Sequence, residues 1–422
     1  MKIAFVFPPM WTPHSDGSLQ IWNREVTTRL SKSCNVFVYS GMFSSQADEY
    51  VDGVRFRRFS TRWDDKFLRP FRAIRDALGI KGPLFRSDLW YAAYYLKVAR
   101  DLRKQGCDAV HVHYYPQFAA LIKYLNPTLR VILHMHGEWL TQVQYNNLES
   151  RLQKIDLVIS CSEFVTKAIC TRFPQVASRC KTVPMGVSPD AFSLRQQNSY
   201  TDRSSSKRLL FVGRVSPEKG VHVLLDAFEL IIRQHPDATL TIVGPEWIAP
   251  REDITDLCLE TDVIASLAPF YKASYLLQLK QRLSPEAAKR VTFAGLVAHS
   301  DIPAFFGRAD IYVSPSLYES FGVTLIEAMA ASLPLVSTRV GAAPELISDG
   351  HNGLLVETAN PSAIADAVMR LFKNNRLRNT MSCSARDTVC KRFSWDTICS
   401  ALTEMYSGVS DTKNVISTIQ NL

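Results

Sequence analysis

The feature that most constrains the fold is an alternation of short apolar runs with amphipathic segments, which occurs once on each side of a polar stretch. Such alternation is typical of parallel α/β sheets, so we expect an α/β protein. The first series predicts a helix at residues 20–31 and strands at 3–7, 35–39, 108–112, 131–134 and 157–160. The second series predicts a helix at residues 221–234 and strands at 208–212, 238–243, 291–293, 311–313, 335–337 and 354–356.

The polar stretch at residues 194–207, LRQQNSYTDRSSSK, is nearly free of large apolar side chains, as a linker between domains would be. It predicts one Rossmann-like domain at residues 1–193 and a second at 208–395, and 422 residues are enough for both. The second series is interrupted at about 246–285, where we expect an insertion on the surface. Open α/β sheets bind ligands beyond the carboxyl ends of their strands. Two such domains therefore predict a cleft that holds two substrates.

The composition excludes several classes of protein. No apolar run approaches the roughly 18–20 residues of a membrane span, and the apolar run in MKIAFVFPP is too short for the core of a signal peptide. The nine cysteines are scattered, without a C-x-x-C pair or a metal-type Cys/His spacing. The sequence therefore predicts reduced thiols, a cytoplasmic protein and no metal site.

Most of the excess positive charge lies in one segment within residues 55–90. Residues 55–86 hold ten Lys/Arg and three Asp, a local charge of +7 within a net charge of +9, and aromatic residues are interleaved with them. Basic residues with aromatics can mark contact with an anionic membrane or a negatively charged acceptor. The alternative interpretation is a solvated helical lid. Nothing in the segment indicates nucleic-acid binding.

The stretch SPSLYESFGVTLIEAMA carries the strongest indication of a binding site. Gly322 lets the backbone approach a ligand closely, and a helix is expected to begin about there. Its free amides and its dipole favour a phosphate group at that end. Glu327 would lie roughly 7–8 Å along this helix, at about 1.5 Å per residue, a suitable distance for the hydroxyls of a ribose. Glu319 lies on the other side of the turn. The alternative is that both acids lie on the surface around a helix start.

A second stretch, LLFVGRVSPEKGVHVLL, predicts a strand that ends at Gly213, a tight loop and a helix that begins near Gly220. Arg214 and Lys219 flank the loop, and two cations at the carboxyl end of a strand suit a diphosphate. The loop lacks the G-x-x-x-x-G-K spacing of a P-loop. The alternative is a solvated loop with unrelated charges.

These two stretches together resemble family 4 of the retaining glycosyltransferases, in the superfamily of glycogen synthases and mannosyltransferases. The resemblance also rests on VTFAGLV at 291–297, GAAPELI at 341–347, KTVPMGVSPDAF before the linker, and FSWDTICSALTEMY near the end. It implies the GT-B fold, in which two Rossmann-like domains face each other. It also implies that residues 396–422 form a C-terminal helix that crosses back to the first domain.

The resemblance further implies roles for individual residues. Glu319 would contact hydroxyls of the donor sugar, Glu327 the ribose, and Arg214 and Lys219 the diphosphate. The first domain would complete the site with Gly17, in HSDGSLQ, and His136, in LHMHGEW. The expected catalytic residues are His136, Glu319, Arg214 and Lys219. The expected donor-binding residues are Gly17, Gly213, Arg214, Lys219, Val297 (through its backbone), Glu319, Ser320, Phe321, Gly322, Val323 and Glu327.

His136 has a rival in His134, and strand alternation places both on the same side of the sheet. The alternative for His136 is a structural role. For His111 and His113 a place in the core or at the rim of the first sheet is favoured.

The sequence therefore predicts a retaining, metal-independent hexosyltransferase without a cofactor. Its donor would be a UDP- or GDP-sugar and its acceptor a hydroxyl of a glycan, a lipid or another small molecule, with peripheral contact to an anionic membrane as one further expectation. Two alternatives are a sugar-nucleotide epimerase of the same fold and a non-catalytic nucleotide-sugar-binding subunit. A Rossmann dehydrogenase is disfavoured because no G-x-G-x-x-G follows the first strand.

Overall fold

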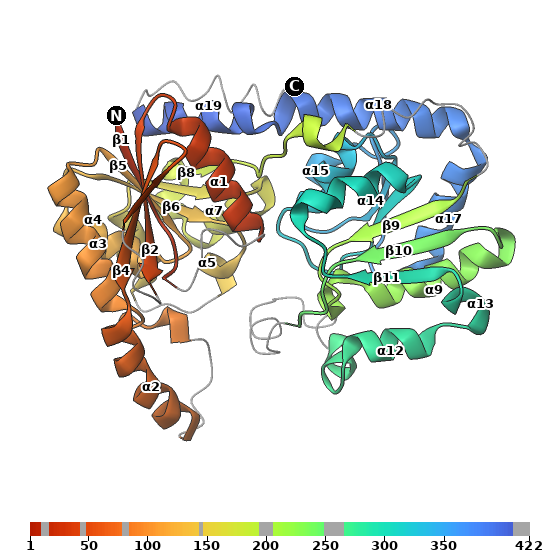
Figure 1. Ribbon diagram of the computed structural model, residues 1–422, viewed down its shortest axis with the longest axis horizontal. Coiled ribbons are helices and arrows are strands. Elements are labelled where there is room, and N and C mark those ends of the chain that lie inside the picture. Colours follow the sequence, from red (N-terminus) through yellow and green to blue (C-terminus); the bar gives the residue numbers. More distant parts are fainter. Residues whose placement is uncertain are drawn as a thin grey trace. The chain divides into compact units, whose positions relative to one another are not determined.

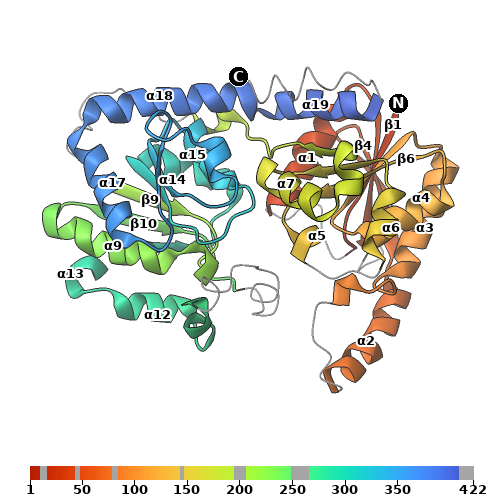
Figure 2. The same cartoon turned by 180° about the vertical axis from the view of Figure 1, so that it is seen from behind.

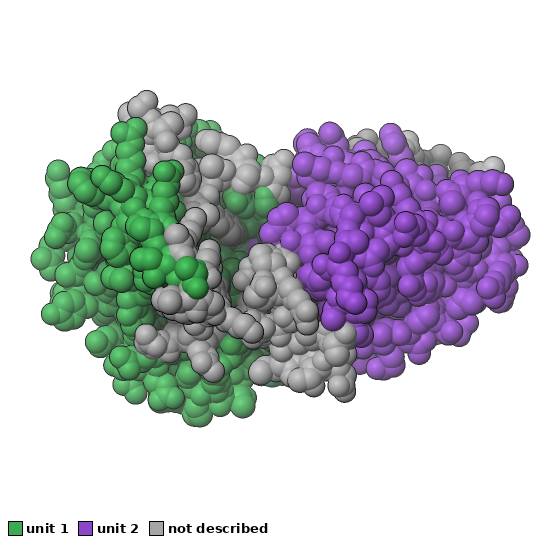
Figure 3. Space-filling model, turned by 90° about the horizontal axis from the view of Figure 1, so that it is seen from below, with its two compact units in different colours: residues 1–184, 398–417 green, residues 185–397, 418–422 purple. Residues whose placement is uncertain are grey.

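A computed structural model describes residues 1–9, 17–42, 48–77, 84–142, 147–193, 206–248 and 266–407. The described chain forms two compact units, coloured separately in Figure 3. Unit 1 contains the chain up to Pro184 and the helical residues from Ile398 on, and unit 2 contains Met185–Thr397. The units thus divide at 184 and 397, whereas the sequence places domain boundaries at 193 and 395. The predicted linker at 194–207 lies mostly outside the described residues.

Unit 1 is built on an eight-stranded sheet in the order β3-β4-β2-β1-β5-β6-β7-β8. Every neighbouring pair is parallel except β3 and β4, which are antiparallel. The central strands are buried on both faces, which explains their continuous apolar runs. The strands are β1 (Lys2–Val6), β2 (Asn35–Met42), β3 (Glu49–Val51), β4 (Val54–Ser60), β5 (Ala109–His113), β6 (Arg130–Met135), β7 (Leu157–Ser160) and β8 (Cys180–Thr182).

Helices cover both faces of this sheet. Figures 1 and 2 show α3 and α4 on one side of it and α1 and α7 on the other. The helices of unit 1 are α1 (Ser18–Leu30), α2 (Arg62–Ala77), α3 (Ala92–Gln105), α4 (Pro116–Leu125), α5 (Trp139–Gln142), α6 (Leu148–Gln153), α7 (Glu163–Arg172) and, from Ile398, α19 (Trp395–Ser407).

Unit 2 contains a six-stranded, fully parallel sheet in the order β11-β10-β9-β12-β13-β14. Its strands are β9 (Arg208–Val212), β10 (Thr239–Val243), β11 (Val291–Gly295), β12 (Ile311–Ser314), β13 (Leu335–Thr338) and β14 (Leu354–Val356). Its helices are α9 (Val221–Gln234), α12 (Tyr275–Arg282), α13 (Pro285–Ala288), α14 (Ile302–Arg308), α15 (Val323–Ala330), α16 (Ala343–Leu346), α17 (Pro361–Lys373) and α18 (Asn375–Arg392). The strand order reverses between β9 and β12, where doubly wound sheets bind ligands.

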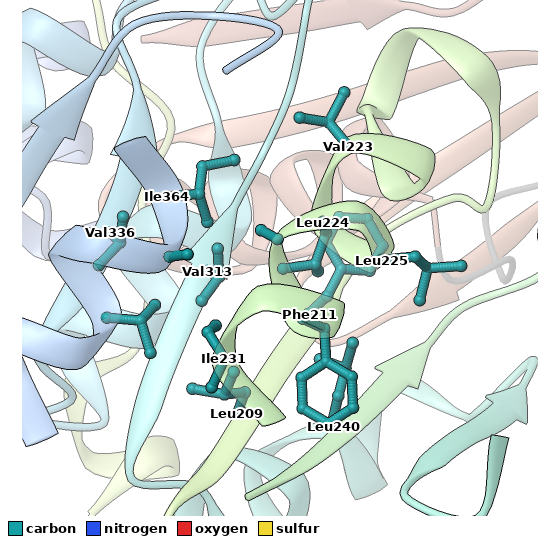
Figure 4. Close-up of a cluster of buried hydrophobic side chains, with 14 of the residues drawn as sticks. Leu209, Phe211, Val223, Leu224, Leu225, Ile231, Leu240, Val313, Val336 and Ile364 are labelled. Atoms are coloured by element: carbon teal, nitrogen blue, oxygen red, sulfur yellow. The ribbon is translucent and has the colours of Figure 1, made fainter. Parts of the chain in front are cut away.

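The core of unit 2 lies between this sheet and helices α9 and α17. Figure 4 shows Leu224 and Ile231 of α9 beside Phe211 of β9, and all three are buried. The apolar residues of α9 recur at helical spacing, so the helix buries one continuous stripe. Full burial of such side chains contributes about 1.5–3 kcal/mol each. This rigid core holds the carboxyl ends of β9 and β12 in place.

Strands β3, β4 and β8 were not predicted from the sequence. Because β4 takes up residues 55–60 of the basic segment, only part of that segment is helical. The sequence VRFRRFS of β4 contains three arginines. Two are paired: Arg57 with Asp101, at 2.8 Å between Nη2 and Oδ1, and Arg58 with Glu49, at 2.6 Å between Nη2 and Oε2. Ion pairing and the backbone pairing with β2 thus stabilise β4. Its low apolar content gives no signal of a strand in the sequence.

The predicted surface insertion at 246–285 also differs from expectation. Residues 249–265 lie outside the described part of the chain. After them, α12 packs against α9, and its Tyr275 and Leu279 are fully buried. The hydroxyl of Tyr275 lies 2.7 Å from Nδ1 of His222 on α9. The end of the insertion therefore belongs to the core of unit 2.

Among the described helices, none has the length and apolarity that crossing a bilayer requires.

Candidate donor-binding site

The two sequence stretches that indicated a site meet at the carboxyl edge of the unit 2 sheet. They lie about a hundred residues apart in the chain, but β9 and β12 are neighbouring parallel strands, so the loops that follow them are adjacent. The carbonyl of Glu218 accepts hydrogen bonds from the backbone amides of Leu317 and Tyr318, at 2.9 and 3.2 Å. Backbone contacts alone thus tie the loop that carries Arg214 and Lys219 to the loop that carries Glu319.

Two glycines permit this close approach. Gly220 and Gly341 have positive φ angles of 68° and 52°. A Cβ atom at Gly220 would lie 2.0 Å from the carbonyl oxygen of Pro315, and one at Gly341 would lie 1.5 Å from that of Glu319. Any side chain at these positions would displace backbone, so the sequence needs glycine at both. Gly341 in particular determines where the backbone of Glu319 lies.

Lys219 and Glu319 form an ion pair across the two loops. Lys219 Nζ donates to Glu319 Oε2 at 2.6 Å, and the two side chains are only 16% and 19% exposed. Charge-assisted hydrogen bonds of this kind are stronger than neutral ones. The pair places a cation and an acceptor side by side at the sheet edge, which suits a ligand that carries both phosphate oxygens and hydroxyls.

Arg214 is held in position by two neighbours that the sequence did not single out. Its Nη2 lies 3.1 Å from Oε1 of Glu218, which is 2% exposed and also accepts a bond from Ser216 Oγ at 2.6 Å. The guanidinium carbon lies 4.7 Å from the ring centroid of Trp247, a cation–π contact. The arginine side chain nevertheless keeps 40% of its surface exposed. It is thus oriented by the protein and still accessible to an anion.

Helix α15 begins where predicted, with Gly322 as its N-cap in the left-handed region at φ 95°. Tyr312 OH donates to Thr324 Oγ1 at 2.7 Å and so fixes the first turn. One turn later Glu327 is buried, and His299 Nε2 lies 3.1 Å from its Oε1. The alternative of two surface acids is therefore wrong for Glu327. A buried carboxylate needs partners, and His299 supplies one.

The remaining predicted residues of unit 2 lie around these loops. Gly213 follows β9, Val297 lies just beyond β11 and is half-buried, and Ser320 and Val323 are also half-buried. Phe321 is buried, and its ring packs edge-on against that of Phe393. Its side chain therefore anchors the loop in the core, and only its backbone is suited to meet a ligand.

The sequence did not predict roles for Glu218, Trp247 or His299. Glu218 lies between Arg214 and Lys219 in the motif itself, and His299 follows Val297 by two positions, so proximity to a motif was the available signal. Trp247 lies after β10 in a segment that was interpreted only as an insertion. Its contact with Arg214 depends on β9 and β10 being neighbours in the sheet.

The two predicted residues of unit 1 lie between β1 and α1 and directly after β6. Gly17 is exposed and is the N-cap of α1; residues 10–16 before it lie outside the described chain. His136 follows β6, and its Nε2 lies 2.8 Å from Nδ1 of His113. Burial lowers the pKa of His136 to about 3, so the ring is neutral at pH 7. The rings of His134 and His136 are 3.9 Å apart, which confirms that both lie on one side of the sheet. His111 and His113 are fully buried core residues, as favoured.

Family models match both halves of the chain. The model described as "Glycosyltransferase Family 4" matches residues 19–191, and the one described as "Glycosyl transferases group 1" matches residues 194–388. Between them they take in both the predicted first domain and the sheet edge described above.

Curated relatives are similar over much of their length. The chain is 26% identical to spore coat protein SA of Bacillus subtilis over 423 residues, which is 96% of this chain and 99% of the relative. It is 25% identical to glycogen synthase of Mycobacterium tuberculosis over 71% of this chain and 68% of that protein.

Solved structures share the fold. The chain matches sucrose-phosphate synthase from Thermosynechococcus elongatus with a TM-score of 0.67 at 21% identity, over 96% of this chain and 98% of that one. It matches Anabaena HepE, solved in complex with UDP, with a TM-score of 0.65 at 18% identity, over 97% and 100% of the two chains.

Proposed function

The chain belongs to the family 4 glycosyltransferases and has the GT-B fold; from this premise we propose that it transfers a sugar, with retention at the anomeric carbon, from a UDP- or GDP-sugar to a hydroxyl of a glycan, a lipid or another small acceptor. The observation that carries the proposal is the Lys219–Glu319 pair at 2.6 Å, beside the N-terminus of the helix that buries Glu327. One short stretch of sheet edge thus offers groups for the sugar, the diphosphate and the ribose.

The departing diphosphate is the first chemical problem. When the sugar–phosphate bond breaks, negative charge develops on the leaving oxygen, and preorganised donors stabilise it without reorganisation. Arg214 and Lys219 supply two cations, and the first amides of α15 point the positive end of a helix at the same edge. Arg214 is already oriented by Glu218 and Trp247, so its side chain loses little further conformational freedom when a phosphate binds.

Lys219 and Glu319 change partners when the donor binds. Without a ligand each neutralises the other. A bound diphosphate forms an ion pair with Lys219. The carboxylate of Glu319 is then available to accept hydrogen bonds from hydroxyls of the sugar. Glu327 accepts from the ribose hydroxyls while His299 holds its other side. For Gly17 and His136, the roles that the family resemblance implies remain predictions.

Two other functions make different predictions for the product. An epimerase of the same fold would convert the nucleotide sugar without lasting release of the nucleoside diphosphate, and a non-catalytic subunit would leave it unchanged. The chain retains Lys219, Glu319 and His136, which a subunit that only binds has no need to keep together. We therefore favour the transferase, acting in the biosynthesis of a glycan or glycolipid.

A thermal-shift panel of nucleotide sugars tests donor binding. We expect a UDP-sugar to raise the melting temperature more than a GDP- or ADP-sugar, because the structurally similar HepE was solved with UDP and UDP-glucose. At a concentration a hundred times Kd, a ligand stabilises the folded state by about 2.7 kcal/mol. If none of the three donor classes shifts the melting temperature at millimolar concentration, the proposed donor site is wrong.

Chelation tests whether the leaving group depends on a divalent metal. Mg²⁺ and Mn²⁺ prefer oxygen ligands and bridge phosphates in enzymes that need them. In this proposal Arg214, Lys219 and helix amides stabilise the negative charge on the leaving diphosphate. We therefore expect EDTA to leave the initial rate of nucleoside diphosphate release unchanged. A rate that falls with EDTA and returns with Mg²⁺ or Mn²⁺, but not with Ca²⁺, would contradict this expectation.

A specific surface favours membrane contact of unit 1. On α2 the side chains of Trp63, Phe67 and Ile74 are 74%, 52% and 58% exposed, and their spacing puts them on one face of the helix. The basic residues Lys66 and Arg69 are also exposed, and Lys66 is the nearer of the two to that face. On another side of the helix, Asp64 caps α3 by accepting from the amides of Ala93 and Tyr94. The helix is therefore anchored with its apolar face outward, and we propose that it rests on an anionic bilayer that presents the acceptor.

Flotation with liposomes tests this surface. We expect the chain to float with anionic vesicles at low salt and to remain in solution with neutral vesicles, because each nearby basic residue contributes about 1 kcal/mol of attraction. Replacing Trp63 and Phe67 with serine should abolish flotation. A matched control is Tyr124→Ser, which removes an aromatic residue that is 73% exposed on α4. Equal loss in both variants, or no flotation of the unaltered chain, would exclude this surface.

A further inference from the structure

Unit 1 contains a cluster of imidazoles that the proposed function does not use. His111 and His113 lie on β5, His134 on the neighbouring β6 and His136 just after it. Both pairs follow an i, i+2 spacing, so all four rings lie on one face of the sheet. The register places His113 directly beside His134. His111, His113 and His134 are each 0% exposed.

The contacts within the cluster leave hydrogen-bonding capacity unused. His111 Nε2 lies 2.8 Å from His134 Nδ1, and His113 Nδ1 lies 2.8 Å from His136 Nε2. Within the described residues, Nε2 of His113 and Nε2 of His134 are buried and have no hydrogen-bond partner. A buried polar atom without a partner is costly, so the unused Nε2 of His113 indicates a missing partner.

The cluster offers nitrogen ligands to a cation. All three rings are fully buried, and a neutral imidazole offers one lone pair to a ligand. One ring nitrogen from each of His111, His113 and His134 lies within 4.8 Å of those of the other two. Neutral imidazoles are good ligands for Zn²⁺ and other late transition metals, whereas Mg²⁺ prefers oxygen.

From this arrangement we propose that His111, His113 and His134 form a structural binding site for a transition-metal ion of the Zn²⁺ class, which cross-links β5 to β6. Two ligand nitrogens of a tetrahedral zinc ion lie roughly 3.3 Å apart. The nitrogens of His111 and His134, now 2.8 Å apart, would therefore separate by about half an ångström, and the nitrogen of His113, which lies within 4.8 Å of theirs, would move closer. The hydroxyl of Tyr406, from α19, lies 2.8 Å from the other nitrogen of His111. This is the outer hydrogen bond that a metal-binding histidine usually makes.

The metal would also act on His136. A metal on Nε2 of His113 requires that its Nδ1 carry the proton, which it then donates to Nε2 of His136. The proton of neutral His136 must in that case lie on its Nδ1. The site thus selects one tautomer and one ring orientation for a histidine at the carboxyl edge of the sheet. This consequence does not require the donor site in unit 2 to be correctly assigned.

Metal content tests the proposal. Because the three rings are fully buried, the ion should be taken up as the chain folds. We expect protein from zinc-supplemented cells, dialysed into metal-free buffer, to hold about one zinc ion per chain, measured by inductively coupled plasma mass spectrometry. His134→Gln and His113→Gln should each lose most of this zinc. A matched control is His222→Gln, which alters a buried histidine of unit 2 and should keep the metal.

A second measurement keeps the proposal testable if the variants fail to fold. Unaltered protein refolded with Co²⁺ should show the visible absorption of tetrahedral cobalt with nitrogen ligands, and competition with Zn²⁺ should remove it. Folded protein with neither zinc nor a cobalt spectrum would overturn the proposal, as would zinc retained in His134→Gln. UDP binding, measured on the same samples, reports separately on unit 2, so failure of one assignment is distinguishable from failure of the other.

Discussion

Replacing Lys219 with alanine is expected to lower the turnover number by about 10²–10³, the usual cost of removing one preorganised donor to a developing negative charge. Arg214→Ala should have an effect of the same size. Both cations lie at the carboxyl edge beside the N-terminus of α15, and both are oriented by carboxylates before any ligand binds. The rate of nucleoside diphosphate release at saturating donor is the measurement that checks this.

Two further variants separate catalysis from structure in this experiment. Lys219→Arg retains the charge and should recover part of the lost rate. Lys391→Ala is a matched control, because Lys391 also forms an ion pair, with Asp387 at 2.8 Å, but on α18 and well exposed. The assignment of the diphosphate site fails if Arg214→Ala and Lys219→Ala both retain activity within about threefold of the unaltered enzyme.

Replacing Glu327 and replacing Glu319 are expected to have different effects on binding and turnover. Glu327→Ala should weaken binding of both the free nucleoside diphosphate and the full donor, because its buried carboxylate accepts from the ribose. The loss of a charged hydrogen-bond partner costs about 1.5–3 kcal/mol, which corresponds to a rise in Kd of roughly 10- to 150-fold. Glu319→Ala should leave the Kd of the nucleoside diphosphate nearly unchanged and lower turnover, because its carboxylate meets only the sugar.

Titration calorimetry with UDP and with UDP-glucose measures this difference directly. A suitable control is Glu229→Ala, which removes a partly buried carboxylate on α9 that bonds Ser284 and lies outside the motifs. If Glu319→Ala weakened UDP binding and Glu327→Ala did not, the two roles would be reversed. Because Glu319 neutralises Lys219 in the free protein, its removal should not weaken the binding of free UDP.

Much of the fold was predictable because most strands of both sheets are buried on both faces. Their sequences are short, continuous apolar runs, and the bounds of β7, β9 and β14, and of helix α9, agree with the sequence prediction. Strand β4 was missed because it lies near the edge of its sheet. Its arginines occupy positions that apolar residues fill in the central strands, and their charges are compensated by Asp101 and Glu49 on other elements.

Only those parts of the site that lie within one short stretch of sequence were predictable. The motifs around Lys219 and Glu319 could be read separately, and the expected helix start at Gly322 is confirmed. The contacts that orient those residues join segments whose proximity depends on strand order. The cation–π contact of Trp247 with Arg214 and the bond from His299 to Glu327 are examples, since the partners follow different strands of the sheet. Single-sequence patterns do not contain that order.

The most direct test of the central claim is a proton NMR time course of the chain with an α-linked UDP-sugar, and with the acceptor once it is identified. Nucleoside diphosphate release and the anomeric configuration of the first sugar product appear in the same spectra. We predict that UDP accumulates and that the first product has the α configuration of the donor, before mutarotation alters any free sugar. A β product, an epimerised nucleotide sugar without UDP, or an unchanged donor would each contradict a retaining glycosyltransferase.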